Sequence, residues 1–261
     1  MKIISAPDYE GMSRKAANLI SAEVILHPRS VLGLATGSTP VGIYRQLADW
    51  YRKGDIDFSQ VHTVNLDEYC GLPADNSQSY HSYMWKNFFS HVNIPADNCN
   101  IPDGNATDIE AECKRYDRLI EALGGIDLQL LGIGRTGHIG FNEPDESFDQ
   151  PTHRIQLKQR TIEDNARFFE TVDEVPKYAI TMGIRAIMQA KKLLLVASGA
   201  GKADILYRTL FGPVTPTIPA SILQFHPNLT VVATEDALSV IHRIRPDVLD
   251  QSNIHRQEAE L

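Results

Sequence analysis

Residues 131–144 read LGIGRTGHIGFNEP and follow the apolar stretch 126–131, which is typical of a strand buried in a parallel sheet. The strand is followed at once by closely spaced glycines, at Gly132, Gly134 and Gly137. Glycine permits sharp turns that bring side chains and backbone amides close together. His138 and Glu143 come next, so a histidine and a carboxylate follow the end of a buried strand. In open α/β sheets ligands bind at that end, so we predict a site here.

This stretch is open to two other interpretations. The glycines formally match G-x-G-x-x-G, the dinucleotide fingerprint, but that motif requires a helix directly after the glycines. Here the continuation HIGFNEP contains another glycine and a proline, which disfavours a helix. The second alternative is a structural turn that carries a surface histidine. The closeness of His138 to both the glycines and Glu143 favours a functional site instead.

The composition is that of a soluble globular protein. The chain has 261 residues, of which 43% are hydrophobic and 22% charged, and we expect one domain over residues 1–261. The net charge of −8 argues against a nucleic-acid partner. The sequence shows neither an apolar stretch of bilayer length nor a signal-peptide core, which predicts no membrane partner. The three cysteines form no C-x-x-C pair, so we expect reduced thiols and a cytoplasmic location.

Buried strands alternate with amphipathic helices along the chain, which predicts a doubly wound, mostly parallel sheet. The main predicted strands cover residues 2–5, 30–35, 61–66, 126–131, 192–197 and 228–233. The clearest predicted helices cover residues 8–26, 41–52 and 108–123. Residues 145–175 are polar and weakly periodic, and we interpret them as a lid over the site.

Polar groups follow the other predicted strands as well. TGST at 36–39 precedes a helix and is predicted to bind an anion, although an ordinary helix cap is the alternative. No G-K-[ST] follows, so the turn suits a phosphomonoester better than a nucleoside triphosphate. One of the adjacent acids Asp67 and Glu68 could be a base, unless DEY is only a surface turn. SGAGK at 198–202 ends in Lys202, which meets an anion or is simply solvated.

These segments resemble the glucosamine-6-phosphate deaminase family, whose members are also called glucosamine-6-phosphate isomerases. The resemblance covers most of the chain, and the combination of DEY-GL with G-GHI-FNEP is its most specific part. The matching segments are GLATGSTP (33–40), VNLDEYCGLP (64–73), LLGIGRTGHIGFNEP (130–144), NARFF (165–169) and SGAGKA (198–203). The resemblance implies a modified Rossmann-like, three-layer α/β/α sandwich.

The resemblance also implies a reaction, in which D-glucosamine 6-phosphate and water give D-fructose 6-phosphate and ammonia. The implied partner is a small phosphosugar, and no metal or organic cofactor is implied. A 6-phosphogluconolactonase-like hydrolase and a galactosamine-6-phosphate deaminase remain alternatives. The same fold serves as a sensor domain in transcription regulators, but we expect no room in this chain for a DNA-binding helix-turn-helix.

Matching the motifs residue by residue implies the roles of individual side chains. Asp67 carries the proton from C2 to C1, His138 acts as acid and base in ring opening, and Glu143 orients His138. The position before the GHI segment usually holds aspartate or asparagine, whereas this chain has Thr136, so slower ring opening is expected. The residues implied to bind the phosphate are Thr36, Gly37, Ser38, Thr39, Arg167 and Lys202.

A further departure concerns regulation. Some family members are hexamers activated by N-acetylglucosamine 6-phosphate, which is bound by an arginine and a lysine two residues apart. His153 and Ile155 align with that pair, although Arg154 lies between them. Isoleucine cannot bind a phosphate, and histidine is largely neutral at pH 7. We therefore expect a monomer or small homo-oligomer in place of an allosteric hexamer.

Overall fold

A computed structural model of the chain describes residues 1–148, 150–159, 162, 163, 169, 171 and 174–250. Its centre is a seven-stranded sheet in which neighbouring strands of the described residues pair in parallel, with the strand order β1-β10-β9-β6-β2-β3-β5. The strands are β1 (Lys2–Ala6), β2 (Val31–Leu34), β3 (His62–Asn65), β5 (Cys99–Asn100), β6 (Leu128–Leu131), β9 (Leu193–Ala197) and β10 (Leu229–Thr234). The predicted mostly parallel sheet is therefore confirmed.

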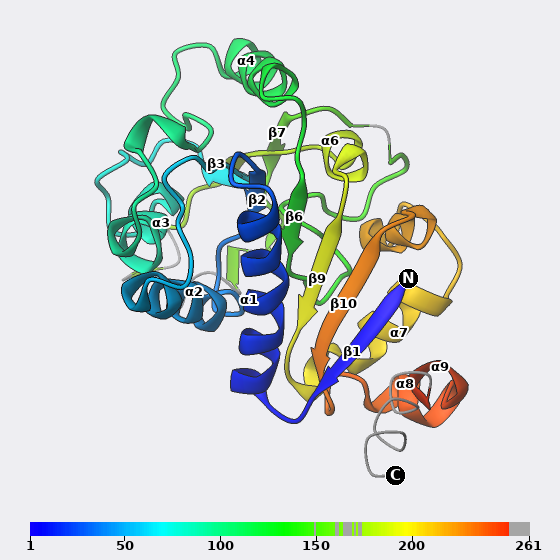
Figure 1. Cartoon of the computed structure of the whole chain (residues 1–261). Helices are drawn as coiled ribbons and strands as arrows, with labels where there is room; N and C mark the ends of the chain where they lie inside the picture. The colour runs from blue at the N-terminus through cyan, green and yellow to red at the C-terminus, as the bar shows by residue number, and fades with distance from the viewer. Residues whose placement is uncertain (149, 160–161, 164–168, 170, 172–173, 251–261) are drawn as a thin grey trace.

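Helices flank this sheet on both sides. The crossovers from β1 to β2 and from β9 to β10 run in opposite directions across the sheet, and right-handed crossovers then place α1 and α7 on opposite faces. Figure 1 shows α1 crossing the sheet in front, which gives the three layers that were predicted. The helices are α1 (Tyr9–Leu26), α2 (Val41–Lys53), α3 (Tyr80–Asn87), α4 (Ile109–Ala122), α6 (Ile184–Gln189), α7 (Ala203–Phe211), α8 (Ser239–Ile244) and α9 (Asp247–Asp250). None of the described helices is long and apolar enough to span a bilayer.

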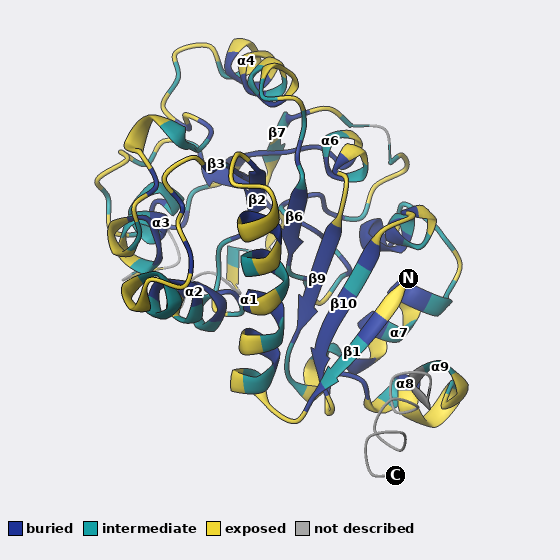
Figure 2. Ribbon diagram, viewed as in Figure 1, coloured by how far each residue is buried: buried dark blue, intermediate teal, exposed yellow. Residues whose placement is uncertain are grey.

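The strands are buried because both faces of the sheet are covered, as Figure 2 shows. Every residue of β2, β6 and β9 is buried. The first helix starts where its sequence predicts, because the Asp8 side chain accepts a hydrogen bond of 2.7 Å from the Gly11 amide.

A second, three-stranded antiparallel sheet, with the order β4-β8-β7, was not predicted. It consists of β4 (Asp67–Tyr69), β8 (Tyr178–Thr181) and β7 (His153–Gln156). The DEY segment is therefore a short strand, and the interpretation of it as a surface turn is wrong. Within the predicted lid, residues 153–156 form β7, so this part is paired sheet. Tyr69, Phe141, Leu157 and Ala179 form a small separate core beside this sheet.

Candidate active site

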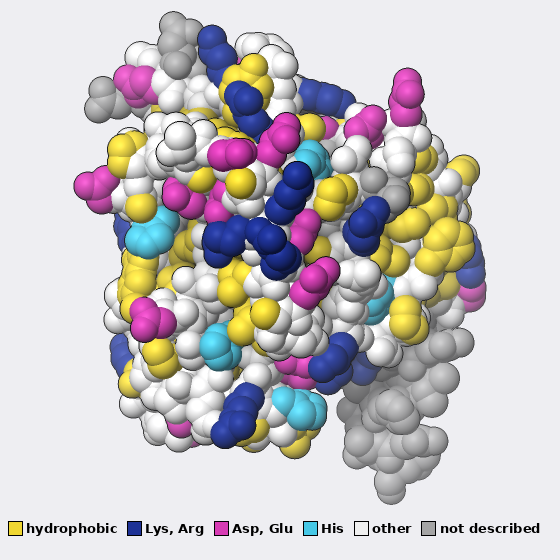
Figure 3. Space-filling view, turned by 90° about the horizontal axis from the view of Figure 1, so that it is seen from above, with side chains coloured by type: hydrophobic (Ala, Val, Ile, Leu, Met, Phe, Trp, Pro, Cys, Tyr) yellow, Lys and Arg dark blue, Asp and Glu magenta, His cyan; other side chains and the backbone are white. Residues whose placement is uncertain are grey.

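The predicted site residues follow the carboxyl ends of the central strands. The opposite edge, seen from above in Figure 3, carries intermixed Lys or Arg and Asp or Glu side chains. A cavity of about 770 Å³ opens there beside Lys191 and Lys192. However, Lys191 Nζ lies 2.7 Å from Asp127 Oδ1, and Lys192 Nζ lies 2.5 Å from Glu23 Oε2. Both lysines at this edge are thus paired with carboxylates, whereas the predicted site lies at the carboxyl edge.

After β6 the glycine turn folds His138 back over its own start. The Gly134 amide donates to the His138 carbonyl at 2.9 Å, and the Gly137 amide donates to the Gly134 carbonyl at 3.1 Å. A Cβ atom placed on Gly134 would lie only 2.0 Å from His138 Cε1. Glycine is therefore required at 134 for the imidazole to occupy its position. No helix follows the glycines, so the dinucleotide interpretation is excluded.

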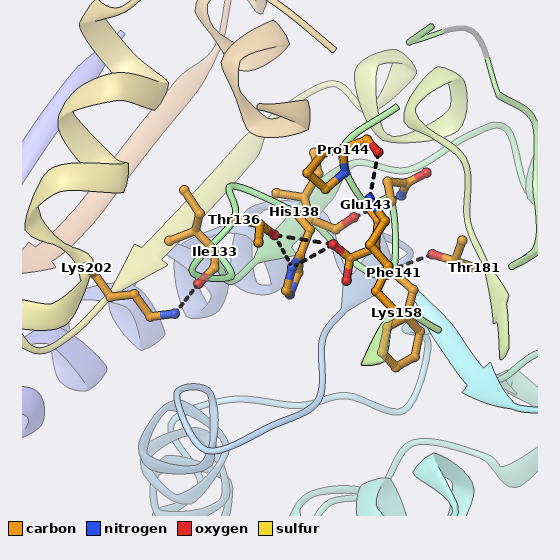
Figure 4. Close-up of polar contacts among 11 residues, drawn as sticks. Ile133, Thr136, His138, Phe141, Glu143, Pro144, Lys158, Thr181 and Lys202 are labelled. Atoms are coloured by element: carbon orange, nitrogen blue, oxygen red, sulfur yellow. Dashed lines mark hydrogen bonds and ion pairs between the residues drawn. The ribbon is translucent and has the colours of Figure 1, made fainter. Parts of the chain in front are cut away.

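Thr136, His138 and Glu143 converge in this turn, as Figure 4 shows. Thr136 Oγ1 lies 2.9 Å from His138 Nδ1 and donates to Glu143 Oε2 at 3.3 Å. The direct separation of His138 Nδ1 and Glu143 Oε2 is 3.6 Å. The Glu143 side chain is 3% exposed and the His138 side chain 25% exposed, so only the imidazole reaches solvent.

This geometry assigns the protons of the site. Because the Thr136 hydroxyl donates to Glu143, its oxygen accepts the proton of His138 Nδ1. In the neutral ring Nε2 is then unprotonated and can act as a base. The Thr136 hydroxyl therefore connects the imidazole to the carboxylate as a relay, at the position where the resemblance implies an aspartate or an asparagine.

Replacing Thr136 with valine is expected to lower kcat about tenfold, because the isosteric methyl group breaks the relay and leaves Nδ1 with the longer contact to Glu143. Thr136→Ser, which keeps the hydroxyl, is the matched control and should stay within about twofold of the parent chain. Steady-state ammonia release measures both. Full activity of the valine variant would show that the direct contact is sufficient.

Asp67 is the first residue of β4 and pairs with Thr181 of β8. Its side chain is buried, and among the described residues none donates a hydrogen bond to its carboxyl group. Burial, helped by the neighbouring charge of Glu68, raises the pKa of Asp67 to about 8. The hydroxyl of the paired Thr181 accepts a hydrogen bond of 3.1 Å from the Phe141 amide. The base candidate is thereby tied to the loop that contains His138 and Glu143.

Glu68 has a structural role, which resolves the ambiguity between the adjacent acids. Successive residues of a strand point to opposite faces, so Glu68 points away from Asp67. It accepts hydrogen bonds of 2.8, 2.9 and 2.9 Å from the amides of Tyr69, Tyr80 and His81. Two of these amides belong to the first turn of α3, where a carboxylate is stabilising. Asp67 is therefore the only one of the pair that is placed to act as a base.

The TGST turn lies between β2 and α2. Gly37 has a φ of +97°, which glycine adopts without strain, and α2 begins at Val41. The Thr36 side chain interacts with the Tyr80 hydroxyl, which in turn lies 3.4 Å from the Tyr69 hydroxyl beside Asp67. This chain of contacts places the predicted phosphate turn and the candidate base in one neighbourhood.

The SGAGK turn differs from its prediction in one respect. Its backbone amides are already engaged, because Gly199 donates to Thr234 Oγ1 at 3.1 Å and Ala200 interacts with Asp236, a side chain just after β10. Hydrogen bonds from the Thr234 hydroxyl, and then from the Ala237 and Ala200 amides, hold the pKa of Asp236 below its usual value. Side chains at the end of β10 thus occupy the amides of this turn. Lys202 Nζ instead donates to the Ile133 carbonyl at 2.7 Å, beside the glycine turn of His138 (Figure 4).

Arg167 lies outside the described residues, so its predicted place at the phosphate stays a prediction.

Among the described side chains, no three His, Cys, Asp or Glu residues come together as a metal site requires. Sequence reasoning left the choice between Asp67 and Glu68 open, and it missed Asp236, Tyr80 and two further tyrosines, Tyr9 and Tyr83, that contact the TGST turn. Segment 79–91 is rich in aromatic residues, and its sequence pattern does not distinguish side chains at the site from side chains of the core.

Comparisons with known proteins identify relatives of this chain. The family model for glucosamine-6-phosphate isomerases and 6-phosphogluconolactonases matches residues 9–233. Glucosamine-6-phosphate deaminases from Lachnoclostridium phytofermentans and Clostridioides difficile are 63% and 52% identical, and the matches cover 89% and 93% of this chain and 98% and 97% of theirs.

Solved structures show the same relationship. A structure described as a monomeric glucosamine-6-phosphate deaminase superposes with a TM-score of 0.90 at 46% identity. The match covers 92% of this chain and 100% of the other chain. The 6-phosphogluconolactonase of Thermotoga maritima has a TM-score of 0.71 at 21% identity, over 90% and 99% of the two chains, which shows a shared fold. The chain therefore belongs to the family of glucosamine-6-phosphate isomerases and 6-phosphogluconolactonases.

Proposed function

We propose that this chain is a glucosamine-6-phosphate deaminase that converts D-glucosamine 6-phosphate and water to D-fructose 6-phosphate and ammonia. The observation that best supports this proposal is a buried carboxyl group, Asp67, next to a histidine loop. Thr181 pairs with Asp67 and binds the loop that contains His138, whose imidazole contacts Thr136. An aldose-to-ketose conversion needs such a pair, since one group opens the ring while the other moves a carbon-bound proton. The substrate carries a charged phosphate and does not cross membranes freely, so we place the reaction in the cytoplasm.

Ring opening is assigned to His138. Its unprotonated Nε2 takes the proton of the O1 hydroxyl and delivers it to O5 as the C1–O5 bond breaks, which leaves an aldehyde at C1. The imidazolium formed in between is stabilised through Thr136 by the buried Glu143 carboxylate. The positive charge of the imidazolium is thus balanced within the site, without a counter-ion from solvent.

Isomerisation and deamination follow at C2. Asp67 in its ionised form removes the C2 proton while O1 takes a proton from the substrate's own C2 ammonium group, which gives a neutral enol-amine. Asp67 then returns its proton to C1, which gives a protonated ketimine at C2. Water adds to the ketimine, and collapse of the adduct yields the ketone and ammonia. The high pKa of the buried Asp67 suits this work, because a more basic carboxylate removes a carbon-bound proton more readily.

The phosphate is assigned to the TGST turn, Lys202 and Arg167. Replacing Lys202 with alanine is expected to raise KM for the phosphosugar about tenfold or more, because a charged donor to the phosphate is lost. Non-phosphorylated glucosamine should be a very poor substrate of the parent chain. A KM that does not change in steady-state assays of the alanine variant would remove Lys202 from the phosphate site.

One assay series tests the proposed function. Purified protein is incubated with glucosamine 6-phosphate, galactosamine 6-phosphate or 6-phosphogluconolactone, and ammonia, ketose phosphate and acid release are measured. We expect ammonia and fructose 6-phosphate from the first compound. Ammonia from the galactosamine compound alone would assign the other epimer, and acid from the lactone without any ammonia release would overturn the deaminase assignment.

We also propose that the protein works without an allosteric activator, as a monomer or small oligomer. Ile155 packs beside the core of Tyr69, Phe141, Leu157 and Ala179, so its side chain is unavailable to a phosphate. Arg154 points to the opposite face of β7, with its guanidinium carbon 3.8 Å from the centre of the Tyr178 ring.

The kinetics are therefore expected to be hyperbolic in the absence of any effector, because an effector acts only through differential affinity for two states. N-acetylglucosamine 6-phosphate is titrated into rate assays at sub-saturating substrate. A sigmoidal baseline that becomes hyperbolic on addition of this compound contradicts the expectation.

A further inference from the structure

Two tyrosine hydroxyls hold the carbonyl groups of the TGST turn. The Tyr83 hydroxyl of α3 donates to the Gly37 carbonyl at 2.5 Å. The Tyr9 hydroxyl of α1 lies 3.0 Å from the Ser38 carbonyl and 3.1 Å from the Thr39 carbonyl. Three successive carbonyl oxygens are thus bound by side chains from two helices that pack against α2 on either side (Figure 1).

The amide groups of the turn differ from its carbonyl groups, which are hydrogen-bonded. Among the described residues no acceptor is found for the backbone N–H groups of Ser38, Thr39 and Val41. These amides lie at the start of α2, where backbone N–H groups and the helix dipole favour an anion. The turn therefore has its carbonyls bound and its amides open, which is the arrangement of an anion-binding nest.

Tyr9 also fixes the first turn of the helix itself. Its hydroxyl accepts a hydrogen bond of 2.8 Å from the Gly42 amide. A Cβ atom on residue 42 would lie 2.4 Å from Ser13 Oγ and 3.0 Å from Tyr9 Cε1, so glycine is needed for α1 to approach α2 this closely. One hydroxyl thus bridges a donor on the helix and the carbonyls of the preceding turn.

Gly37 makes such restraint necessary. At a φ of +97° glycine is free of the steric limits that hold other residues, so the peptide between 37 and 38 can rotate at low cost. Rotation would turn the Gly37 carbonyl toward the phosphate and the Ser38 amide away from it. The Tyr83 hydroxyl opposes this rotation, and burial together with nearby Tyr9 keeps its pKa above the usual value, so the donor proton is retained.

The SGAGK turn provides an internal comparison. Its Gly199 amide already donates to the Thr234 hydroxyl at 3.1 Å and its Ala200 amide interacts with Asp236, so the Lys202 side chain is the group of that turn directed toward the site. Backbone recognition of a phosphate therefore falls to the TGST turn, whose amides are open. The groups that orient this turn are then determinants of phosphate affinity.

We propose that Tyr9 and Tyr83 are positioning residues that hold the TGST turn in its phosphate-binding conformation by binding its carbonyl groups. This inference rests on the proposed function, since it assigns a phosphate to this turn. Neither tyrosine touches the reacting carbons in this arrangement, so their removal changes ground-state and transition-state binding of the phosphate equally.

The test uses Tyr83→Phe and Tyr9→Phe, which keep the rings and remove only the hydroxyls. Tyr51→Phe is the matched control, because Tyr51 lies in α2 and no hydrogen bond of its hydroxyl is found among the described residues. KM and kcat for glucosamine 6-phosphate are measured, together with the calorimetric Kd of inorganic phosphate and the Tm. The phosphate Kd does not depend on which sugar the protein converts.

Each phenylalanine variant is expected to raise both KM and the phosphate Kd about five- to tenfold, with kcat within about twofold of the parent chain and the control unchanged. An unchanged phosphate Kd in both variants overturns the inference while leaving the deaminase assignment intact. A kcat that falls while the phosphate Kd stays constant also overturns it, because the hydroxyls then act elsewhere. Weaker phosphate binding in a protein that lacks deaminase activity upholds the inference and rejects the proposed reaction.

Discussion

Asp67→Asn is expected to lower kcat by about 10³-fold or more, because the amide keeps the shape of the side chain but cannot remove the C2 proton. Exchange of the substrate C2 hydrogen with solvent should disappear along with turnover, since both depend on the same base. The measurement is tritium or deuterium incorporation from labelled water, followed beside ammonia release. Near-normal exchange in the asparagine variant would sink the assignment of Asp67.

The same variant is expected to be more stable than the parent chain, although it is less active. The pKa of Asp67 is about 8 in the folded chain, through burial and then the charge of Glu68, and about 4 in an unfolded one. The unfolded state therefore ionises first as pH rises, and the folded state loses stability between about pH 4 and about pH 8. Asparagine has no such loss. The Tm of the variant minus that of the parent should grow through this window and then level off, whereas a constant offset would show that Asp67 titrates normally.

Gly134→Ala is expected to lower kcat by about 10²-fold or more without removing any catalytic group, because misplacement alone has costs of this size. A Cβ atom at 134 would lie 2.0 Å from His138 Cε1 and 2.1 Å from His138 Nε2, so the imidazole has to leave its position. The Thr136 relay is then broken, since it depends on a contact of 2.9 Å to His138 Nδ1.

The comparison variant for this prediction is His138→Ala, with the double variant completing a cycle. If Gly134→Ala acts only by displacing the imidazole, the two losses do not add, and the double variant resembles His138→Ala. Phosphate affinity should be unaffected in all three. Additive losses, or full activity of Gly134→Ala, would contradict the close packing of the ring on residue 134.

The sequence predicts the central sheet well because its strands are continuous apolar runs that are buried on both faces. The run before Gly132 and the all-buried strand β9 are examples, and both were predicted to within two residues at each end. The second sheet was not predicted, because β4, β7 and β8 are only three or four residues long and pair with partners far along the chain. Short antiparallel strands of this kind leave little periodicity to detect.

Within the candidate site, local segments were more predictable than long-range partners. Thr136, His138 and Glu143 lie within eight residues of one another, so the turn that joins them is encoded by adjacent glycines. In contrast, the choice between Asp67 and Glu68 depends on the amides of α3, and the amides of the SGAGK turn are bound by Thr234 and Asp236. No pattern in the sequence reveals such contacts, since they are set by how distant segments pack.

The link between Asp67 and the imidazole loop has a consequence for how the site tolerates substitution. Thr181 pairs with Asp67 in the sheet, and its hydroxyl accepts a hydrogen bond of 3.1 Å from the Phe141 amide. Gly140 has a φ of +57°, and a Cβ atom on it would lie 3.0 Å from Thr181 Oγ1 and 3.5 Å from Asp67 Oδ2, so glycine suits the close approach of the loop. The relative placement of the two proton-transfer groups thus depends on positions 140 and 181. A substitution at either position is expected to change the geometry of both groups at once, although neither residue transfers a proton itself.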